Sequence, residues 1–243
     1  GTAFGAREGT LASWLARADA LALRMFEAFL AEVPLHGESV IEAERRRLRR
    51  DVARFIEDDW DDARPRGFVT VEHAFGDHDG VVVETAAGPL WVSGRIDRID
   101  IEQGVTLVRD LKTGRANPRD GQRAAPSVDL DLQLALYVLV TGQLARTWGI
   151  PTDVAGAYAY TDARSPVRDR AFISDRHALR AAGRRWLDAA AAMLRDGAFV
   201  QSPVDADCRS CPFSSVCDDE PWESSGVASA AVLSPRGARV RPV

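Results

Sequence analysis

Residues 94–114 read Gly-Arg-Ile-Asp-Arg-Ile-Asp-Ile-Glu-Gln-Gly-Val-Thr-Leu-Val-Arg-Asp-Leu-Lys-Thr-Gly, and this stretch predicts a β-hairpin. β-Branched residues flank the dipeptide Gln103-Gly104, where the glycine can supply the positive φ of a two-residue turn. With that turn, Asp97 on the first strand directly faces Asp110 on the second. The hairpin is therefore expected to hold two carboxylates side by side on one face.

Two carboxylates that face each other on neighbouring strands repel unless a cation lies between them. Asp97 and Asp110 therefore favour a divalent-metal site, since hard oxygen ligands suit Mg²⁺ or Mn²⁺. The alternative is a solvated hairpin with scattered charges.

Lys112 is the only lysine among the 31 basic residues of the chain. The period-2 alternation of a strand places Lys112 on the face of Asp110 and turns Leu111 to the other face. A compact ammonium can approach a phosphate or a nucleophilic water in a way that a planar guanidinium cannot. A lysine two residues after a carboxylate thus favours chemistry over a solvated hairpin.

The bulk composition is ordinary for a globular protein, with 243 residues, 46% hydrophobic and 28% charged. A net charge of −5 excludes a global basic field, so any nucleic-acid binding would depend on local patches. No apolar run approaches the roughly 20 residues of a membrane span, so we expect no membrane partner. Three cysteines near the end of the chain indicate a reducing, cytoplasmic compartment. Because the first residue is Gly, we expect the chain to be cut from a longer one.

Apolar residues at helical spacing predict two N-terminal helices, over residues 10–32 and 39–63. Ser39 and Glu42 fit a capping box at the start of the second helix. That helix carries an arginine-rich run at 45–50 and an acidic run at 58–62. Such a pattern is typical of a solvated face with charge pairs, and the alternative is a contact between the arginines and a DNA backbone.

Period-2 patterns predict an antiparallel meander of four strands, at 68–75, 81–85, 90–101 and 105–112. The elements expected after it are an arginine-bearing loop at 115–125, an apolar helix starting near Asp129, a strand at 152–160 and a helix capped by Ser174 that ends near Arg195. These elements fit one α/β or α+β domain over residues 1–220. Residues 221–243, rich in Ser, Gly, Ala and Pro, predict a disordered tail.

Gln133 and Tyr137 lie at i and i+4 on the helix that follows the hairpin, so their side chains share one face. A tyrosine at helical spacing among leucines is usually a core residue. The glutamine beside it and the Asp-x-Lys one loop upstream favour the alternative, a place beside the site.

Three motifs in this order resemble the RecB-type nuclease branch of the PD-(D/E)XK superfamily, over roughly residues 68–217. They are Gly-Arg-Ile-Asp97, Asp110-Leu-Lys112 and Gln133-x-x-x-Tyr137. The resemblance implies an α/β fold with a restriction-endonuclease-like core, in which helices flank a mixed central sheet that contains the antiparallel meander. It also implies metal-dependent hydrolysis of phosphodiesters.

The resemblance further implies a role for each matching residue. Asp97 and Asp110 would bind the catalytic Mg²⁺ or Mn²⁺, assisted by the backbone carbonyl of Leu111. Asp100 would face Leu107 in the expected register, which makes Asp97 the preferred ligand. The matching lysine would position or activate the attacking water and stabilise the phosphate, and the last motif would orient the lysine or the nucleic-acid backbone. These last residues are Lys112, Gln133 and Tyr137.

All three cysteines, Cys208, Cys211 and Cys217, fall within ten residues in a C-x2-C-x5-C pattern that is typical of a metal site. The pattern resembles the C-terminal part of the 4Fe-4S staple of AddB- and AdnB-like nucleases and of related CRISPR-adaptation nucleases. In those proteins a fourth cysteine lies far upstream, and it is absent here. It would lie upstream of Gly1, or the cluster is lost or has other ligands. Zinc is the alternative metal.

The first helix departs from the resemblance. Many relatives carry a metal-binding histidine there, where this chain has Ser13 in the context Gly-Thr-Leu-Ala-Ser. His36 lies in a predicted loop and is a poor substitute. A site with fewer protein ligands and more waters is one that magnesium tolerates, and loss of activity is the alternative. Glu72 is expected to be structural or to lie just outside the metal ligands.

The sequence therefore predicts a metal-dependent DNA nuclease, an exonuclease on single-stranded or unwound DNA in repair or recombination. Its expected partners are DNA and a helicase domain or subunit, as part of a helicase–nuclease. The alternative is a catalytically weakened DNA-binding or scaffold module on the same fold. A zinc-stabilised structural domain is a third.

Overall fold

The computed structural model describes residues 9–60, 66–76, 81–114, 132–165 and 175–197, and the backbone of 169–171. The helices are α1 (Leu11–Glu32), α2 (Glu38–Asp59), α3 (Leu132–Trp148) and α4 (Arg176–Asp196). The strands are β1 (Arg66–Phe75), β2 (Val81–Thr85), β3 (Gly88–Val92), β4 (Gly94–Glu102), β5 (Val105–Lys112), β6 (Val154–Tyr160) and β7 (Asp169–Ala171).

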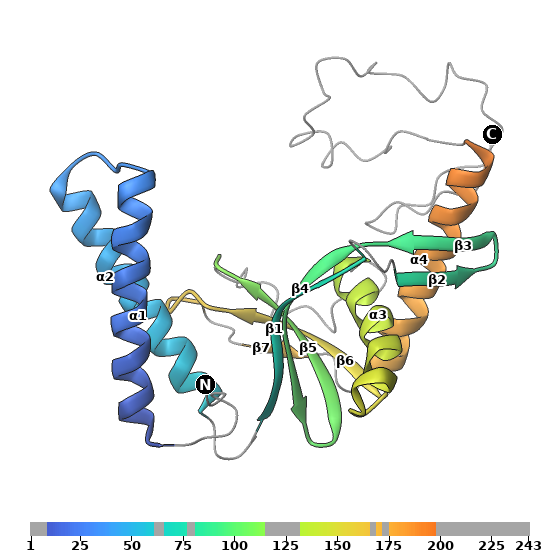
Figure 1. Cartoon of the computed structure of the whole chain (residues 1–243), viewed down its shortest axis with the longest axis horizontal. Coiled ribbons are helices and arrows are strands. Elements are labelled where there is room, and N and C mark those ends of the chain that lie inside the picture. Colours follow the sequence, from blue (N-terminus) through green and yellow to red (C-terminus); the bar gives the residue numbers. More distant parts are fainter. Residues whose placement is uncertain are drawn as a thin grey trace.

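Five strands form the central sheet in the order β1-β4-β5-β6-β7. Strands β5 and β6 are parallel, whereas the other neighbours are antiparallel. The α1–α2 hairpin lies on one side of the sheet, and α3 and α4 pack on the other (Figure 1). This confirms the α/β fold with a mixed central sheet flanked by helices.

The β4–β5 hairpin has the predicted register. Gln103 and Gly104 form its turn with φ values of 52° and 78°, and two positive φ angles are those of a type I′ turn. Glu102 pairs with Val105, and the ladder of paired residues runs from there to Arg98 and Arg109. A two-residue turn thus fixes which side chains share a face.

The predicted four-strand meander is wrong in one respect, because β2 and β3 leave the central sheet and pair only with each other. The strand predicted at 90–101 breaks at Ser93. Gly76, with φ 88°, ends β1 against that bend: a Cβ on it would lie 2.4 Å from the carbonyl oxygen of Val92. The β2–β3 hairpin instead packs its buried Val83 against Leu139 of α3 and Leu187 of α4.

Two predicted helix caps are also wrong. The N-cap of α2 is Gly37 without a side-chain hydrogen bond, so Ser39 lies inside the helix. The N-cap of α4 is Asp175, one residue after the predicted Ser174. In both helices the packing of the apolar face, rather than a capping side chain, decides at which residue the helix begins.

Several predictions fall outside the described residues. They concern the loop at 115–125, the helix start near Asp129, the three cysteines and the tail at 221–243. The end of the second helix, predicted near residue 63, is wrong by a few residues, because α2 ends at Asp59 with Trp60 as its C-cap.

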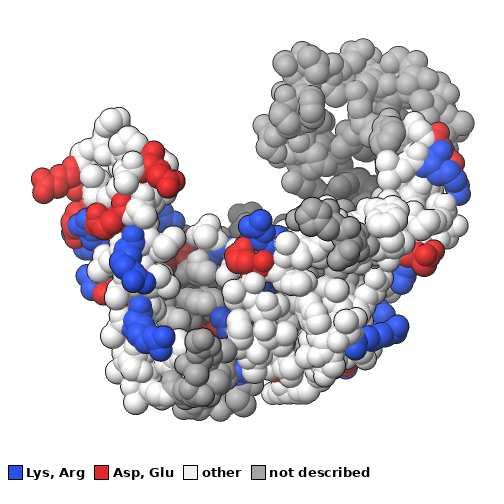
Figure 2. Space-filling model, in the orientation of Figure 1, with Lys and Arg blue, Asp and Glu red and all other residues white. Residues whose placement is uncertain are grey.

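The arginine-rich run of α2 is a solvated face with charge pairs, as predicted. Arg45 lies 2.9 Å from both Glu27 and Glu42, and Arg49 lies 2.6 Å from Asp19 on α1. Figure 2 shows positive and negative side chains intermingled along this hairpin. The alternative contact with a DNA backbone therefore gains no support from the arrangement.

The face of the sheet under α3 is apolar. Ile99 of β4 and Val108 of β5 pack there against Leu134 and Val138 of α3 and Leu179 of α4. Each of these side chains is at most 1% exposed, so this cluster is the main core of the described part of the chain.

The other face of the sheet is ionic where α2 approaches it. Six charged side chains there are more than nine-tenths buried, and we call them the ion cluster: Asp59, Arg66, Arg98, Asp100, Glu102 and Arg109. Asp59 is the last residue of α2, whereas the other five lie on β1, β4 and β5. Burial raises the pKa of the Asp100 carboxyl above its usual range, against the lowering effect of Arg98 and Arg109.

No helix in the described part of the chain is long and apolar enough to cross a membrane.

The close contact between β6 and α3 predicts a sensitivity to one methyl group. A Cβ added at Gly156 would lie 2.6 Å from Cγ of the buried Leu134, so Gly156→Ala should destabilise the fold by about 1–3 kcal/mol. Gly142→Ala is the matched control, since its Cβ would meet nothing closer than 3.9 Å and a helix favours Ala by up to about 1 kcal/mol. Urea unfolding measures both changes, and equal stability of the two variants would contradict the packing described.

Candidate active site

The site is built at the end of β5, where strand alternation sorts neighbouring side chains onto two faces. Asp110 and Lys112 share one face, and their side chains form an ion pair. Leu111 points the other way and lines a groove against α2. The predicted directions of these three side chains are therefore confirmed.

Asp97 of β4 reaches the same end of the hairpin. Its Oδ2 accepts a hydrogen bond of 2.7 Å from the backbone N–H of Leu111. The Asp97 carboxylate therefore lies beside β5 at the residue between Asp110 and Lys112. The Asp110 side chain is nearly buried, whereas Asp97 is half-buried. Asp100 pairs with Leu107, as expected, and belongs to the ion cluster on the other face.

The first turns of α3 bring the last predicted motif to the lysine. The Lys112 ammonium donates a hydrogen bond of 3.4 Å to Oε1 of Gln133. Nε2 of Gln133 in turn donates to the Tyr137 hydroxyl at 3.1 Å. The Tyr137 ring is buried and meets Phe75 edge to face, with centroids 6.1 Å apart. Tyr137 thus fits both interpretations of the sequence, as a core residue whose hydroxyl faces the site.

Two further contacts hold Lys112 that the sequence did not reveal. The ammonium lies 5.1 Å from the centroid of the Tyr158 ring on β6, a cation–π contact. The backbone N–H of Thr161, just after β6, donates to the Lys112 carbonyl oxygen at 3.0 Å. Both contacts depend on the parallel pairing of β5 with β6, which places Tyr158 beside Asp110. No tight turn joins two parallel strands, so the sequence does not show which of their residues pair.

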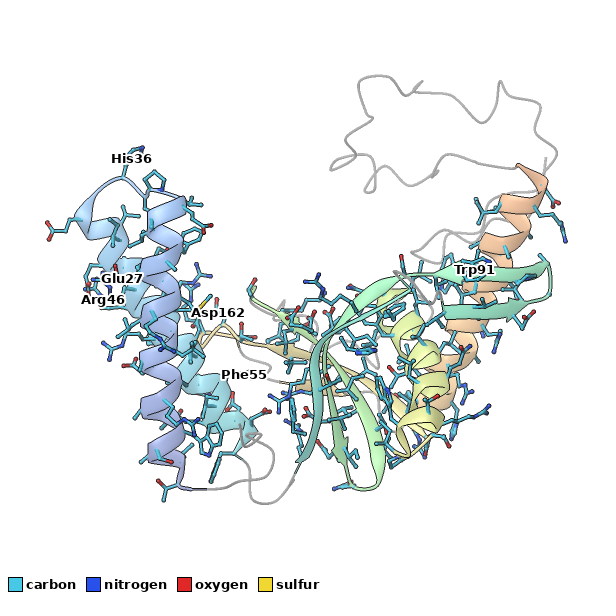
Figure 3. All side chains as sticks on the ribbon, in the orientation of Figure 1. Glu27, His36, Arg46, Phe55, Trp91 and Asp162 are labelled. Atoms are coloured by element: carbon cyan, nitrogen blue, oxygen red, sulfur yellow. The ribbon has the colours of Figure 1, made fainter. Side chains whose placement is uncertain are left out.

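A groove of about 560 Å³ lies on the Leu111 side of the strand end. Its walls are mainly apolar and include Phe26 of α1 and Phe55 of α2. Figure 3 shows Phe55 and Asp162 where α2 approaches the sheet and the loop after β6. Hydrogen bonds from Arg164 lower the pKa of Asp162 to about 2, so this carboxylate near the groove stays ionised.

The first helix supplies a cap rather than a ligand at the position where relatives are expected to have histidine. Ser13 and Thr10 form a capping box, in which each side-chain oxygen accepts the other residue's backbone N–H at 3.2 Å. His36 lies at the tip of the α1–α2 hairpin, away from the sheet (Figure 3). Glu72 is exposed and lies 3.7 Å from Arg95.

The donor set fits magnesium or manganese. Asp97 and Asp110 provide hard carboxylate oxygens, and the Leu111 carbonyl is a third oxygen of the same strand end. Among the described residues, no group of three or more His, Cys, Asp or Glu side chains is placed to hold a metal. A site with two carboxylates suits Mg²⁺, which usually retains several waters and binds through one or two carboxylates.

A mixed sheet that presents two carboxylates and a lysine from one hairpin defines a nuclease-type core. The chain belongs to the PD-(D/E)XK nuclease superfamily, whose family model matches residues 6–218. Members of this superfamily are generally nucleases and usually use divalent metals such as Mg²⁺, with DNA as substrate. A search of curated proteins finds no match.

Divalent metal should stabilise the folded protein, because it relieves the repulsion between Asp97 and Asp110. When free Mn²⁺ is about a hundred times its Kd, the melting temperature should rise by roughly 5–10 °C. Asp97→Asn and Asp110→Asn should each remove most of this rise, whereas Asp153→Asn, which breaks an ion pair with Arg176 near the opposite end of β5, should retain it. Differential scanning calorimetry with and without Mn²⁺ makes the comparison, and an unchanged rise in both hairpin variants would exclude this metal site.

Proposed function

We propose that the protein is a metal-dependent deoxyribonuclease of the RecB-type branch, with residues 1–220 as one nuclease domain. It would act in the cytoplasm as an exonuclease on single-stranded or unwound DNA, in repair or recombination and with a helicase domain or subunit. The observation that carries the proposal is the meeting of the Asp97 and Asp110 carboxylates with the Lys112 ammonium at one strand end. The preference for single strands and the helicase partner rest on the resemblance of the motifs.

Asp97 and Asp110 would hold the metal. Bound there, Mg²⁺ or Mn²⁺ would polarise the phosphoryl group and lower the pKa of a bound water. The Leu111 N–H orients the Asp97 carboxylate by its hydrogen bond to Oδ2. This hydrogen bond leaves the second oxygen, Oδ1, available as a ligand.

Lys112 would act on the substrate directly. Its side chain is 40% exposed, so a phosphate can reach the ammonium. Asp110, Gln133 and the Tyr158 ring surround it from three elements and keep it at the strand end. An ammonium fixed there can stabilise the charge that develops on the phosphate and orient the attacking water.

Gln133 and Tyr137 would set the position of the ammonium. The Tyr137 hydroxyl accepts a hydrogen bond from Nε2 of the Gln133 amide, and the amide oxygen faces Lys112. The amide oxygen is the only part of the group that can accept a hydrogen bond from an ammonium. Through these two hydrogen bonds, the buried Tyr137 ring would keep the Lys112 ammonium in position.

Cleavage of labelled single-stranded DNA in Mg²⁺ or Mn²⁺ tests the proposal. Asp110→Ala and Lys112→Ala should each lower kcat by about a hundredfold or more, because the first removes a ligand of the metal and the second removes the cation at the reacting phosphate. Lys112→Arg should also lose activity, since a planar guanidinium does not match the contacts of the ammonium. EDTA should abolish cleavage, and Asp153→Asn should leave it unchanged.

Full activity of Lys112→Ala or Asp110→Ala would overturn the proposed chemistry. Wild-type protein that binds DNA without cleaving it at any metal concentration would favour a catalytically weakened DNA-binding or scaffold module instead. The capping role of Ser13 is the observation that motivates this second candidate.

We also propose that Cys208, Cys211 and Cys217 ligate a 4Fe-4S cluster with a fourth ligand from outside this triplet. Local thiolates at this spacing are typical of such clusters. Protein purified without oxygen should be brown and contain iron, and Cys211→Ser should lose both the colour and the iron. Metal analysis that finds stoichiometric zinc in place of iron would show the alternative zinc site.

A further inference from the structure

The ion cluster includes the residues next to both proposed metal ligands. Arg98 follows Asp97 on β4, and Arg109 precedes Asp110 on β5. Arg98 and Arg109 are the last pair of the hairpin ladder and face each other directly. Beyond this pair the chain continues to the two carboxylates.

One carboxylate from another element joins this pair. Nη1 of Arg109 lies 2.7 Å from Oδ1 of Asp59, and Nη1 of Arg98 lies 2.9 Å from Oδ2 of the same side chain. Asp100 also contacts both arginines, but its distance to Arg109 is 3.4 Å. Asp59 therefore bridges the two arginines of this last pair with a shorter distance to Arg109 than Asp100 has, and with an equal one to Arg98.

The charges make this contact necessary. Two arginines directly opposite each other on neighbouring strands repel, and both are more than nine-tenths buried. The two carboxylates just beyond them also repel until a metal binds. Without Asp59, the two arginines would share only the carboxylate of Asp100 among the described residues, and the remaining repulsion would push β4 and β5 apart at the site.

The position of Asp59 is not explained by the stability of α2. It is the last residue of that helix, where the negative end of the helix dipole disfavours a carboxylate. Its neighbour Asp58 forms a half-exposed pair with Arg54 in the helix. Asp59 instead turns its side chain into the sheet, so its role lies in the contacts made there.

We propose that Asp59 is a positioning residue of the metal site, which sets the separation of Asp97 and Asp110 by holding Arg98 and Arg109 together. The inference rests on the proposed metal-dependent function. It assigns to the α1–α2 hairpin a part in metal binding that involves no ligand from that hairpin. Asp59 touches neither the metal nor the substrate.

Mn²⁺ binding by the DNA-free protein, followed by electron paramagnetic resonance, tests the inference. Asp59→Asn keeps the size of the side chain and removes its charge, and it should weaken the Kd for Mn²⁺ by about tenfold, as loss of an outer-shell partner does. The signal is assigned to this site by its loss in Asp97→Asn. Asp58→Asn, one residue away and half-exposed, should bind Mn²⁺ like the wild type.

Glu102→Gln is the control for a merely structural role. Glu102 is equally buried in the ion cluster, but its described ion pair is with Arg66, at the turn end of the hairpin. Both Asp59→Asn and Glu102→Gln should lower the melting temperature, and only Asp59→Asn should weaken Mn²⁺ binding. Wild-type affinity in Asp59→Asn, or the same loss in Glu102→Gln, would overturn the inference.

A second measurement needs no variant. Because coupling between two sites is reciprocal, Mn²⁺ should slow hydrogen exchange in the last turn of α2 in the wild-type protein. Unchanged exchange there at saturating Mn²⁺ would overturn the inference even if Asp59→Asn does not fold. A protein that binds Mn²⁺ in this way but cleaves no DNA would contradict only the nuclease proposal.

Discussion

Three arginines and three carboxylates are buried together between α2 and the central sheet, and the rest of the structure depends on their mutual neutralisation. A buried charge that loses its partner destabilises a fold by several kcal/mol. Asp59 contacts three arginines, Arg66, Arg98 and Arg109, from three different strands. The sheet therefore requires the helical hairpin, since without α2 these arginines would lack the anion that lies between them.

The two faces of the sheet divide the work of stability and chemistry. Under α3, Ile99 and Val108 form part of an apolar core, while the adjacent pair Arg98 and Arg109 faces α2. Because side chains alternate along β5, the same eight residues present Arg109 to the ion cluster and Asp110 to the site. The site thus lies at a strand end that packing fixes from both sides.

The sequence predicts best where local chemistry decides. The Gln103-Gly104 turn sets the hairpin register, and that register sets the faces of Asp110 and Lys112. It predicts less where two residues or segments have the same local pattern and only contacts with distant parts of the chain distinguish them. Nothing local distinguishes Asp59 from its neighbour Asp58, although Asp59 is buried and paired with arginines of three strands. The departure of β2 and β3 from the sheet is hidden in the same way, because both strands have the period-2 pattern of a central strand.

The arrangement of the first helix bears on how the proposed metal site would be completed. The N-terminal end of α1, which holds Ser13, lies level with the β4–β5 turn in Figure 1, well apart from the far end of β5. The capping box that Ser13 forms with Thr10 gives this end of the helix a structural task. The α1–α2 hairpin contributes through the last residue of α2 instead, where Asp59 neutralises the arginines next to both carboxylates. Two carboxylates held at a fixed separation, with water in the remaining positions, are a donor set that Mg²⁺ accepts without a ligand from the first helix.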